Sequence, residues 1–296
     1  MLSVNIGKLM REALYYHAKD NYLICDLCPH ACRLEDNQTG LCRGRKAIAG
    51  KLYAVNYGNS TGMALDPIEK KPLYHFNPGT MILSLGPNSC NLSCSFCQNW
   101  QISQEQCVTY PITIECLYSQ IVQMDCQQVA FTYTEPMMWY EFIMDFANSY
   151  PDVQIVIITN GYLKEEPWKA MLNKVSAMNI DLKSIRNEFY KTVCKGDVAT
   201  VKRNIELAYS TGIHLELTYL LIPESNATDK EIEELAKYVA SIDPMIPLHI
   251  SAYHPAYKDT TRATSPNEVM HACDIAAKCL KHVYAGNVFI PKYSRR

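Results

Sequence analysis

The sequence predicts an α/β protein in which six parallel strands and their crossover helices form a partial barrel, a (β/α)6 arrangement, behind a small cysteine-rich module. After residue 80, short runs rich in β-branched and aromatic residues alternate with amphipathic helical stretches. Six such runs are too few for a closed eightfold barrel. Residues 1 to about 75 lack this alternation and carry four closely spaced cysteines. We therefore expect an N-terminal module at 1–75 and the partial barrel at 76–296.

The expected strands are short and are bounded by Gly, Pro, Asn or charged residues. They are MILSLG (81–86), QVAFTYT (128–134), QIVIITN (154–160), MNIDLK (178–183), HLELTYLLI (214–222) and PLHISAY (247–253). Two of the helices between and after them have recognisable starts, a capping box at Thr228 and Glu231 and the stretch SPNE at 265–268. Active-site residues of such folds gather at the C-terminal ends of the strands, so we searched there.

Composition excludes several classes of function. The 28 Lys and Arg residues and 30 Asp and Glu residues give a net charge of -2, which argues against nucleic acid or an anionic membrane as a partner. No apolar run reaches about 18 residues, so we expect no membrane span. The stretch MLSVNIGKLMREALYYHAKD has scattered charges and no small-residue cleavage site, so we do not interpret it as a signal peptide. A cytoplasmic location is expected.

Thirteen cysteines are the most unusual feature of the sequence. A disulfide framework is not expected, because the cytosol keeps thiols reduced and the count is odd. Seven of the cysteines fall into two clusters, and the other six are dispersed among mostly helical segments, where free Cys usually packs as a small hydrophobe. The two clusters are therefore interpreted as sites for metal or catalysis.

The second cluster lies in CNLSCSFCQNW, where Cys90, Cys94 and Cys97 follow the first expected strand. A closed structural zinc site takes four ligands, so three thiols leave one position open for chemistry. Three thiolates suit a 4Fe-4S cluster, because soft iron prefers sulfur ligands. The alternative is an incomplete zinc site that a distant His completes.

The first cluster lies in CDLCPHACRLEDNQTGLC and contains Cys25, Cys28, Cys32 and Cys42. We expect these four to bind a second metal centre, because they can converge without a large core around them. Their spacing suits either tetrahedral zinc or a fully ligated 4Fe-4S cluster. Zinc would be a structural staple, whereas a cluster would relay electrons to the second cysteine cluster. The alternative is four unligated cysteines packed against the barrel.

The pattern C-x3-C-x2-C, with the aromatic Phe96 before its last Cys, resembles the radical S-adenosylmethionine superfamily. The resemblance implies that the three cysteines hold three irons of a 4Fe-4S cluster, with Phe96 beside the cofactor. It also implies that the methionyl amine and carboxylate of S-adenosylmethionine chelate the open iron. The reaction it implies is reductive cleavage to methionine and a 5′-deoxyadenosyl radical, which takes hydrogen from a substrate.

Other strand ends carry residues that the resemblance assigns to the cofactor. Glu135, in TYTEP, occupies the place where the family commonly presents a polar group to the methionyl amine. Its alternative role is that of a helix N-terminal carboxylate before Pro136. Thr159 and Asn160, in ITNG, look like the segment of activating enzymes that lies beside the cofactor.

Two further strand ends suggest catalytic residues. In DLK, Asp181 and Lys183 resemble the D-x-K at the active site of glycyl-radical activating enzymes, with Asp181 expected at the cofactor and Lys183 in catalysis. A solvated strand end is the alternative. His254, in SAYHP, is expected to line the cofactor or substrate pocket, and a structural histidine is its alternative.

Longer stretches narrow the resemblance. They are CDLCPHACRLEDNQTGLCRGR, YGNSTGMALDPIEKKPLYHFNPGT, CNLSCSFCQNWQIS and VYAGN. Together they look like the radical enzyme of the AmmeMemoRadiSam system, itself similar to pyruvate formate-lyase activating enzyme. In DPIEKKPLYHFNPGT, residues Lys70, Lys71 and His75 either face the mouth of the active site or belong to a surface connector.

The resemblance implies an oxidoreductase of the pyruvate formate-lyase activating type with an unidentified small-molecule or protein substrate. It implies a reductant such as flavodoxin or ferredoxin, and association with Memo-type and AMMECR-type proteins. The alternative is an iron–sulfur or zinc protein that transfers electrons or binds partners without cleaving S-adenosylmethionine.

Overall fold

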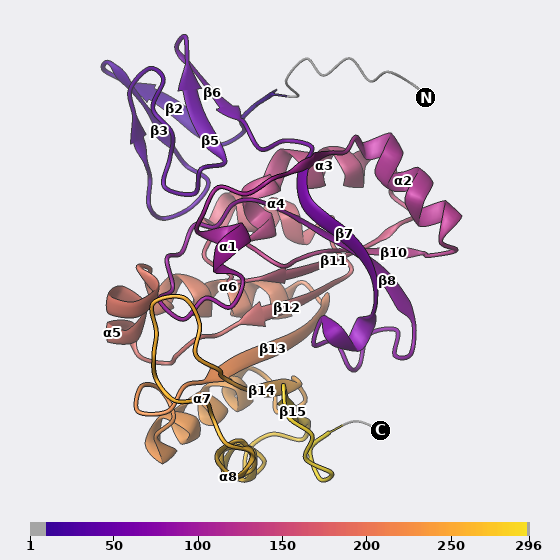
Figure 1. Cartoon of the computed structure of the whole chain (residues 1–296), viewed down its shortest axis with the longest axis vertical. Coiled ribbons are helices and arrows are strands. Elements are labelled where there is room, and N and C mark those ends of the chain that lie inside the picture. The colour runs from indigo at the N-terminus through magenta and orange to yellow at the C-terminus, as the bar shows by residue number, and fades with distance from the viewer. Residues whose placement is uncertain (1–9, 295–296) are drawn as a thin grey trace.

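The computed structural model describes residues 10–294 and is built around one nine-stranded sheet (Figure 1). The sheet order is β15-β14-β13-β12-β11-β10-β8-β7-β9, and all neighbours from β8 to β15 are parallel. These parallel strands are β8 (Met81–Pro87), β10 (Gln128–Phe131), β11 (Gln154–Thr159), β12 (Ala177–Asp181), β13 (His214–Leu221), β14 (Leu248–Ala252) and β15 (Val283–Gly286). The six expected strands and the partial barrel are confirmed, and β15, from the VYAGN stretch, extends the sheet by one parallel strand.

Helices cover one face of this sheet and connect its strands. The longer ones are α2 (Ile114–Gln123), α3 (Tyr140–Ser149), α4 (Glu165–Leu172), α6 (Val198–Ser210), α7 (Asp229–Ile242) and α8 (Pro266–Ala276). The shorter ones are α1 (Trp100–Ser103), α5 (Asn187–Phe189) and the turns η1 (Ile68–Lys70), η2 (Pro136–Trp139) and η3 (Tyr190–Cys194). Ser265 and Glu268 form a complete capping box at α8. At α7, Thr228 accepts from the Glu231 backbone, but the Glu231 side chain bonds to Ser184 and Tyr219 rather than back to the cap.

The opposite face of the sheet is filled by the segment at 67–80, which we call the plug. Ile68 and Leu73 of the plug form a fully buried cluster with Ile82, Ala130 and Val156 of the first strands. Burying large apolar side chains there removes the inner face of the strands from water. The plug is therefore part of the core of the barrel and not a surface connector.

Polar contacts hold the plug inside the barrel. The buried Lys71 pairs with Asp66 at 2.8 Å. Asn179 Nδ2 donates to the Pro72 carbonyl at 2.7 Å, and the His75 backbone donates to the buried Glu216, near the start of β13, at 2.7 Å. Lys70 faces the C-terminal ends of the strands, whereas His75 lies at the other end of the barrel.

The N-terminal module contains two three-stranded antiparallel sheets, β1-β6-β5 and β2-β3-β4 (Figure 1). The strands are β1 (Arg11–Glu12), β2 (Tyr16–Lys19), β3 (Tyr22–Cys25), β4 (Arg33–Leu34), β5 (Arg45–Ile48) and β6 (Lys51–Ala54). Strand β7 (Asn59–Pro67) lies within the range 1–75 that we predicted for the module, but it pairs with β8 and β9 (Tyr110–Pro111). Residues 59–67 therefore belong to the large sheet, because pairing with β8 satisfies backbone groups at that edge.

The module packs on η2, α3 and the second cysteine cluster. Trp139 Nε1 donates to the Asn56 carbonyl at 2.6 Å, and Asn56 Nδ2 donates to the Met138 carbonyl at 3.0 Å. Just before α4, Lys164 pairs with Asp26 of the module at 2.6 Å.

The first nine residues of the stretch that we examined for a signal peptide lie outside the described residues. Within 10–294, no helix has the length and apolar character needed to cross a bilayer.

Candidate active site

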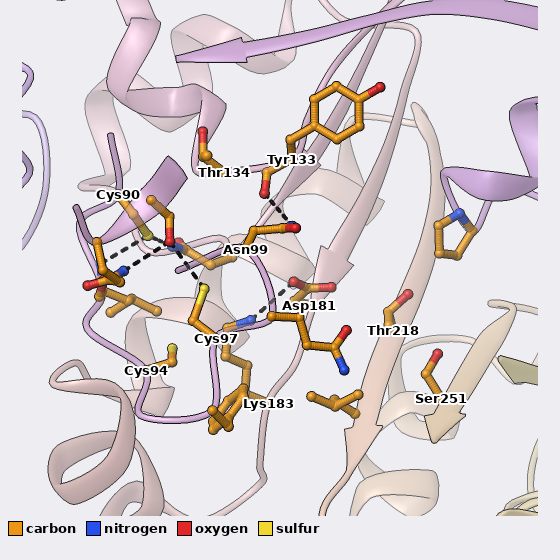
Figure 2. Close-up of a pocket in the computed structure, with 18 of the residues that line it drawn as sticks. Cys90, Cys94, Cys97, Asn99, Tyr133, Thr134, Asp181, Lys183, Thr218 and Ser251 are labelled. Atoms are coloured by element: carbon orange, nitrogen blue, oxygen red, sulfur yellow. Dashed lines mark hydrogen bonds and ion pairs between the residues drawn. The ribbon is translucent and has the colours of Figure 1, made fainter. Parts of the chain in front are cut away.

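A polar cavity of about 340 Å³ opens at the C-terminal ends of the parallel strands (Figure 2). Its wall combines the second cysteine cluster with residues that follow β10, β11, β12 and β15 and residues of β13 and β14. This is the edge at which parallel α/β folds place their active sites.

The loop after β8 brings Cys90, Cys94 and Cys97 to this one cavity (Figure 2). Cys94 is buried, whereas Cys90 and Cys97 are partly exposed. Backbone bonds from Ser93 to Cys194 (3.0 Å) and from Ser95 to the carbonyl of Val193 (3.3 Å) hold the loop against η3. The loop is thus fixed by a segment about 100 residues away, and its thiols border open space.

The pKa values of the three thiols are all raised, so without a metal these groups stay protonated. Burial raises the pKa of Cys90 and of Cys97. The pKa of Cys94 is also raised, mainly by a hydrogen bond with Cys194 and next by burial. A metal lowers thiol pKa values strongly, so coordination is what would turn these groups into thiolates. In residues 10–294, no three His, Cys, Asp or Glu side chains are placed to hold a single ion. Three soft sulfur donors around a cavity of this size fit an iron–sulfur cluster, which is wider than one ion.

Asn160, Asp181, Lys183 and Phe96 all line the cavity. Lys183 Nζ pairs with Asp181 at 3.1 Å, and its side chain is 15% exposed. The same ammonium lies 6.0 Å from the centre of the buried Phe96 ring. Asn160 Nδ2 donates to Asn91 at 2.9 Å and lies 3.8 Å from Cys90 Sγ. The cavity therefore offers the carboxylate of Asp181 and the ammonium of Lys183 beside the thiols, and Lys70 adds a second positive group to its wall.

Glu135 and Thr159 lie behind the wall and do not line the cavity. The buried Glu135 carboxylate accepts from Thr159 Oγ1 (2.7 Å) and from the backbone N–H groups of Asn160 (2.8 Å) and Met137 (3.1 Å). Burial raises the Glu135 pKa to about 7, although these hydrogen bonds oppose the rise. The bond to Met137 caps η2, which is the alternative that we gave for this residue. Its contact with a cofactor stays a prediction.

His254 is exposed and lies beside the cavity rather than in its wall. Its Nδ1 accepts a hydrogen bond of 3.1 Å from Gln98 Nε2, and Gln98 does line the cavity. His254 is thus one side chain removed from the site, and its catalytic role stays a prediction.

Several wall residues escaped sequence analysis. They are chiefly Tyr133, Thr134, Thr218, Ser251 and Asn287, whereas Lys70, which we expected either at the mouth of the active site or in a surface connector, does line the cavity. Thr218 and Ser251 lie on the same inner face as Glu216 and His249, two positions earlier in each strand, so the strand period of two was an available signal. Tyr133 has a φ of 69°, a left-handed conformation that a tyrosine rarely adopts and that only the structure reveals.

Comparisons with known proteins agree with this geometry. The model of the radical SAM superfamily matches residues 86–239, more than half of the chain. The uncharacterized protein MJ0808 of Methanocaldococcus jannaschii is 39% identical over 288 residues, which is 94% of this chain and 86% of that protein.

Solved structures show the same fold at low sequence identity. A radical SAM methyltransferase from Sphaerobacter thermophilus is similar with a TM-score of 0.54 and 15% identity, over 71% of this chain and 67% of that chain. SuiB from Streptococcus suis, solved with S-adenosylmethionine bound, is similar with a TM-score of 0.55 and 11% identity, over 70% of this chain and 51% of that chain. With its three-cysteine loop, its open cavity and its matched family model, this chain belongs to the radical SAM superfamily.

Proposed function

We propose that this chain is an enzyme that cleaves S-adenosylmethionine reductively and uses the resulting radical to take hydrogen from a substrate. The observation that carries the proposal is the placement of Cys90, Cys94 and Cys97 around one open cavity in a radical SAM domain. When bound there, a reduced 4Fe-4S cluster supplies the electron that breaks S-adenosylmethionine into methionine and the 5′-deoxyadenosyl radical.

The residues of this chain would bind and orient the reactants. S-adenosylmethionine carries a methionyl ammonium and a carboxylate, and Asp181 and Lys183 offer the complementary charges in the cavity wall. Charge-assisted hydrogen bonds are the strong ones in a partly buried site. Asn160 and Thr134 add polar contacts near Cys90, while Phe96 closes one side of the cavity. The small volume limits water around a reactive radical.

We further propose that the reaction is of the pyruvate formate-lyase activating type and that the chain acts within the AmmeMemoRadiSam system, beside Memo-type and AMMECR-type proteins. The longer sequence stretches support this, although they name no small-molecule or protein substrate. A one-electron carrier such as flavodoxin or ferredoxin would reduce the cluster. We also propose a cytoplasmic location, because the cytosol would keep reduced the thirteen cysteines, seven of which lie at the two proposed metal centres.

A second metal centre at Cys25, Cys28, Cys32 and Cys42 belongs to the same proposal. The four residues line one cavity, which supports their acting together. As zinc the centre would hold the module together; as a fully ligated 4Fe-4S cluster it would take one electron from the carrier and pass it to the catalytic cluster.

The decisive experiment is anaerobic reconstitution with iron and sulfide, followed by reduction and addition of S-adenosylmethionine. Formation of 5′-deoxyadenosine and methionine in equal amounts is expected. An S-adenosylmethionine-dependent change in the electron paramagnetic resonance signal would show the cofactor on the open iron. Reduced, fully loaded protein that forms no 5′-deoxyadenosine would favour the alternative, an electron-transfer or partner-binding protein.

A further inference from the structure

The four N-terminal cysteines line a small cavity of about 10 Å³. Cys25 ends β3, Cys28 and Cys32 bracket the turn that follows, and Cys42 comes from the loop before β5. The turn is closed by backbone bonds from Cys25 to Cys32 (3.0 Å) and from Ala31 to Cys28 (3.1 Å). Three of these cysteines are buried and Cys32 is partly buried. The module thus gathers four soft donors around one small cavity.

Arg45, the first residue of β5, lines the same cavity and is only 1% exposed. Its Nη1 pairs with Glu141 Oε1 at 2.9 Å and donates to the Leu14 carbonyl at 3.2 Å. Its Nε and Nη2, however, are buried without a hydrogen-bond partner. Leaving such N–H groups unsatisfied is costly, so a buried guanidinium with two free donors indicates an acceptor that belongs beside it.

The charge expected of a metal–thiolate centre indicates which acceptor the free N–H groups of Arg45 would bind. Glu141 balances the charge of Arg45, but it engages only one of the three guanidinium nitrogens. Four thiolates bound to one divalent ion, or to a 4Fe-4S core of charge +2, carry a net charge of -2. Sulfurs of such a centre accept N–H hydrogen bonds, and those bonds tune the metal.

We propose that Cys25, Cys28, Cys32 and Cys42 hold a closed tetrathiolate metal centre and that Arg45 donates its two unpaired N–H groups to the sulfurs. The inference rests on the second metal centre of the proposed function and adds the residue that stabilises its charge. Since no three thiols in residues 10–294 are placed for a single ion, either the turn tightens around zinc or a wider cluster is bound. Both centres carry a net charge of -2, so Arg45 would donate its N–H groups to negatively charged sulfurs in either case.

The centre lies directly behind the catalytic loop. Ser89 Oγ donates to the Cys42 carbonyl, and His30 Nε2 donates to the Asn91 carbonyl at 2.7 Å. Between these two contacts is Cys90, which faces the catalytic cavity. An iron–sulfur centre here would accept one electron from a protein carrier and be reoxidised by passing it to the catalytic cluster through this short segment.

The test uses the full chain with Cys90, Cys94 and Cys97 replaced by Ala, so that only N-terminal metal is counted. In this background, Arg45→Met/Glu141→Met removes the buried pair together, because removing Arg45 alone would leave Glu141 uncompensated. The matched control is Lys51→Met/Glu12→Met, which removes an exposed ion pair of the same module and keeps Arg45, Glu141 and the free donors. Zinc and iron with sulfide are supplied separately, and bound metal and its release to a chelator are measured.

We expect the parent and the control to bind metal equally, and the double variant to release it roughly 10–100-fold faster. If the metal is an iron–sulfur cluster, its midpoint potential should also fall in the double variant, because the two N–H groups no longer donate to the sulfurs and stabilise the added electron. Near-ultraviolet circular dichroism checks that the double variant is folded; should it unfold, Arg45→Lys, which keeps the charge but not the two free N–H groups, is compared with the parent instead. No metal in the parent background overturns the second centre itself, whereas bound metal with unchanged release and potential overturns only the role of Arg45.

Discussion

The two cysteine clusters of this chain differ in the size of the cavity that they line. The second cluster presents three thiols to a cavity of about 340 Å³, while the four thiols of the first line a much smaller cavity of about 10 Å³. Three donors leave a coordination position for a substrate, and four leave none. The comparison teaches that the number of thiols and the room around them change together, so chemistry is expected at one cluster and support or electron supply at the other.

The clusters also differ in how the fold holds them. The catalytic loop follows a buried parallel strand and is bound to η3 by backbone hydrogen bonds, so its shape does not depend on a metal. Of the N-terminal thiols only Cys25 is on a strand, and the others lie in loops between strands of two to four residues, where little apolar core is available. Loss of metal should therefore abolish activity at the Cys90, Cys94 and Cys97 loop without unfolding it, and should destabilise the N-terminal module.

The largest effect is expected from replacing Cys90, Cys94 and Cys97 by Ala. Formation of 5′-deoxyadenosine should be abolished, because no thiolate remains to hold the cluster, while the melting temperature should change little. Liquid chromatography of the reduced reaction and a thermal melt measure the two quantities. Cys116→Ala, at an exposed and dispersed position, is the control and should retain activity. Product from the triple variant would contradict the assignment of the catalytic cluster.

The next largest effect is expected from Cys28→Ala in the smaller cavity. The N-terminal metal should be lost, and with it about 4 kcal/mol of stability, if the metal is present at about a thousand times its Kd. For a chain of this size that corresponds to a fall in melting temperature of roughly 10 °C. Measurement is by metal analysis and calorimetry.

The activity of Cys28→Ala with two different reductants distinguishes a structural metal site from an electron relay. With a chemical reductant, 5′-deoxyadenosine formation should persist, because the catalytic loop is intact. With a protein carrier, activity should fall only if the N-terminal centre is an electron relay. Full metal content in Cys28→Ala would count against ligation by this residue.

A smaller effect is expected from Glu135→Gln, which tests the wall of the open cavity. Its carboxylate fixes Thr159 and the backbone of Asn160, and Asn160 faces the cavity. Losing charged acceptors costs about 1.5–3 kcal/mol, so S-adenosylmethionine affinity should fall on the order of tenfold to a hundredfold. Isothermal titration of the loaded protein measures this. Unchanged affinity with a lower melting temperature would leave only the cap of η2 as the role of Glu135.

The smallest effect is expected from His30→Phe, which removes the hydrogen bond to Asn91 that links the two regions. Phenylalanine keeps a ring against Tyr162, so the loss should be about 1 kcal/mol, or roughly 2–4 °C in melting temperature. Both metals should stay bound. Loss of the N-terminal metal would instead mean that His30 is one of its ligands.

Local patterns predicted the barrel strands well. Their alternation with helices and their bounding residues are properties of nearby sequence, and so is the spacing that delivers Cys90, Cys94 and Cys97 to one cavity. Asp181 and Lys183 were also found, because a charged residue at the end of an apolar strand stands out. Glu135 was found too, but its burial behind the wall depends on Thr159 and Asn160 of a distant segment as well as on Met137 beside it.

The sequence by itself determined the parallel αβ core, the two cysteine clusters and the family resemblance, since each rests on local stretches of at most about 25 residues. Only the tertiary structure decided that the plug fills the barrel, that β7 joins the large sheet, and that Arg45 stands beside Cys25 and Cys42 with two donors free. Such pairings join segments far apart in the chain. Such pairings depend on how much apolar surface the whole fold buries and on how many buried polar groups it pairs. A short sequence pattern contains neither quantity.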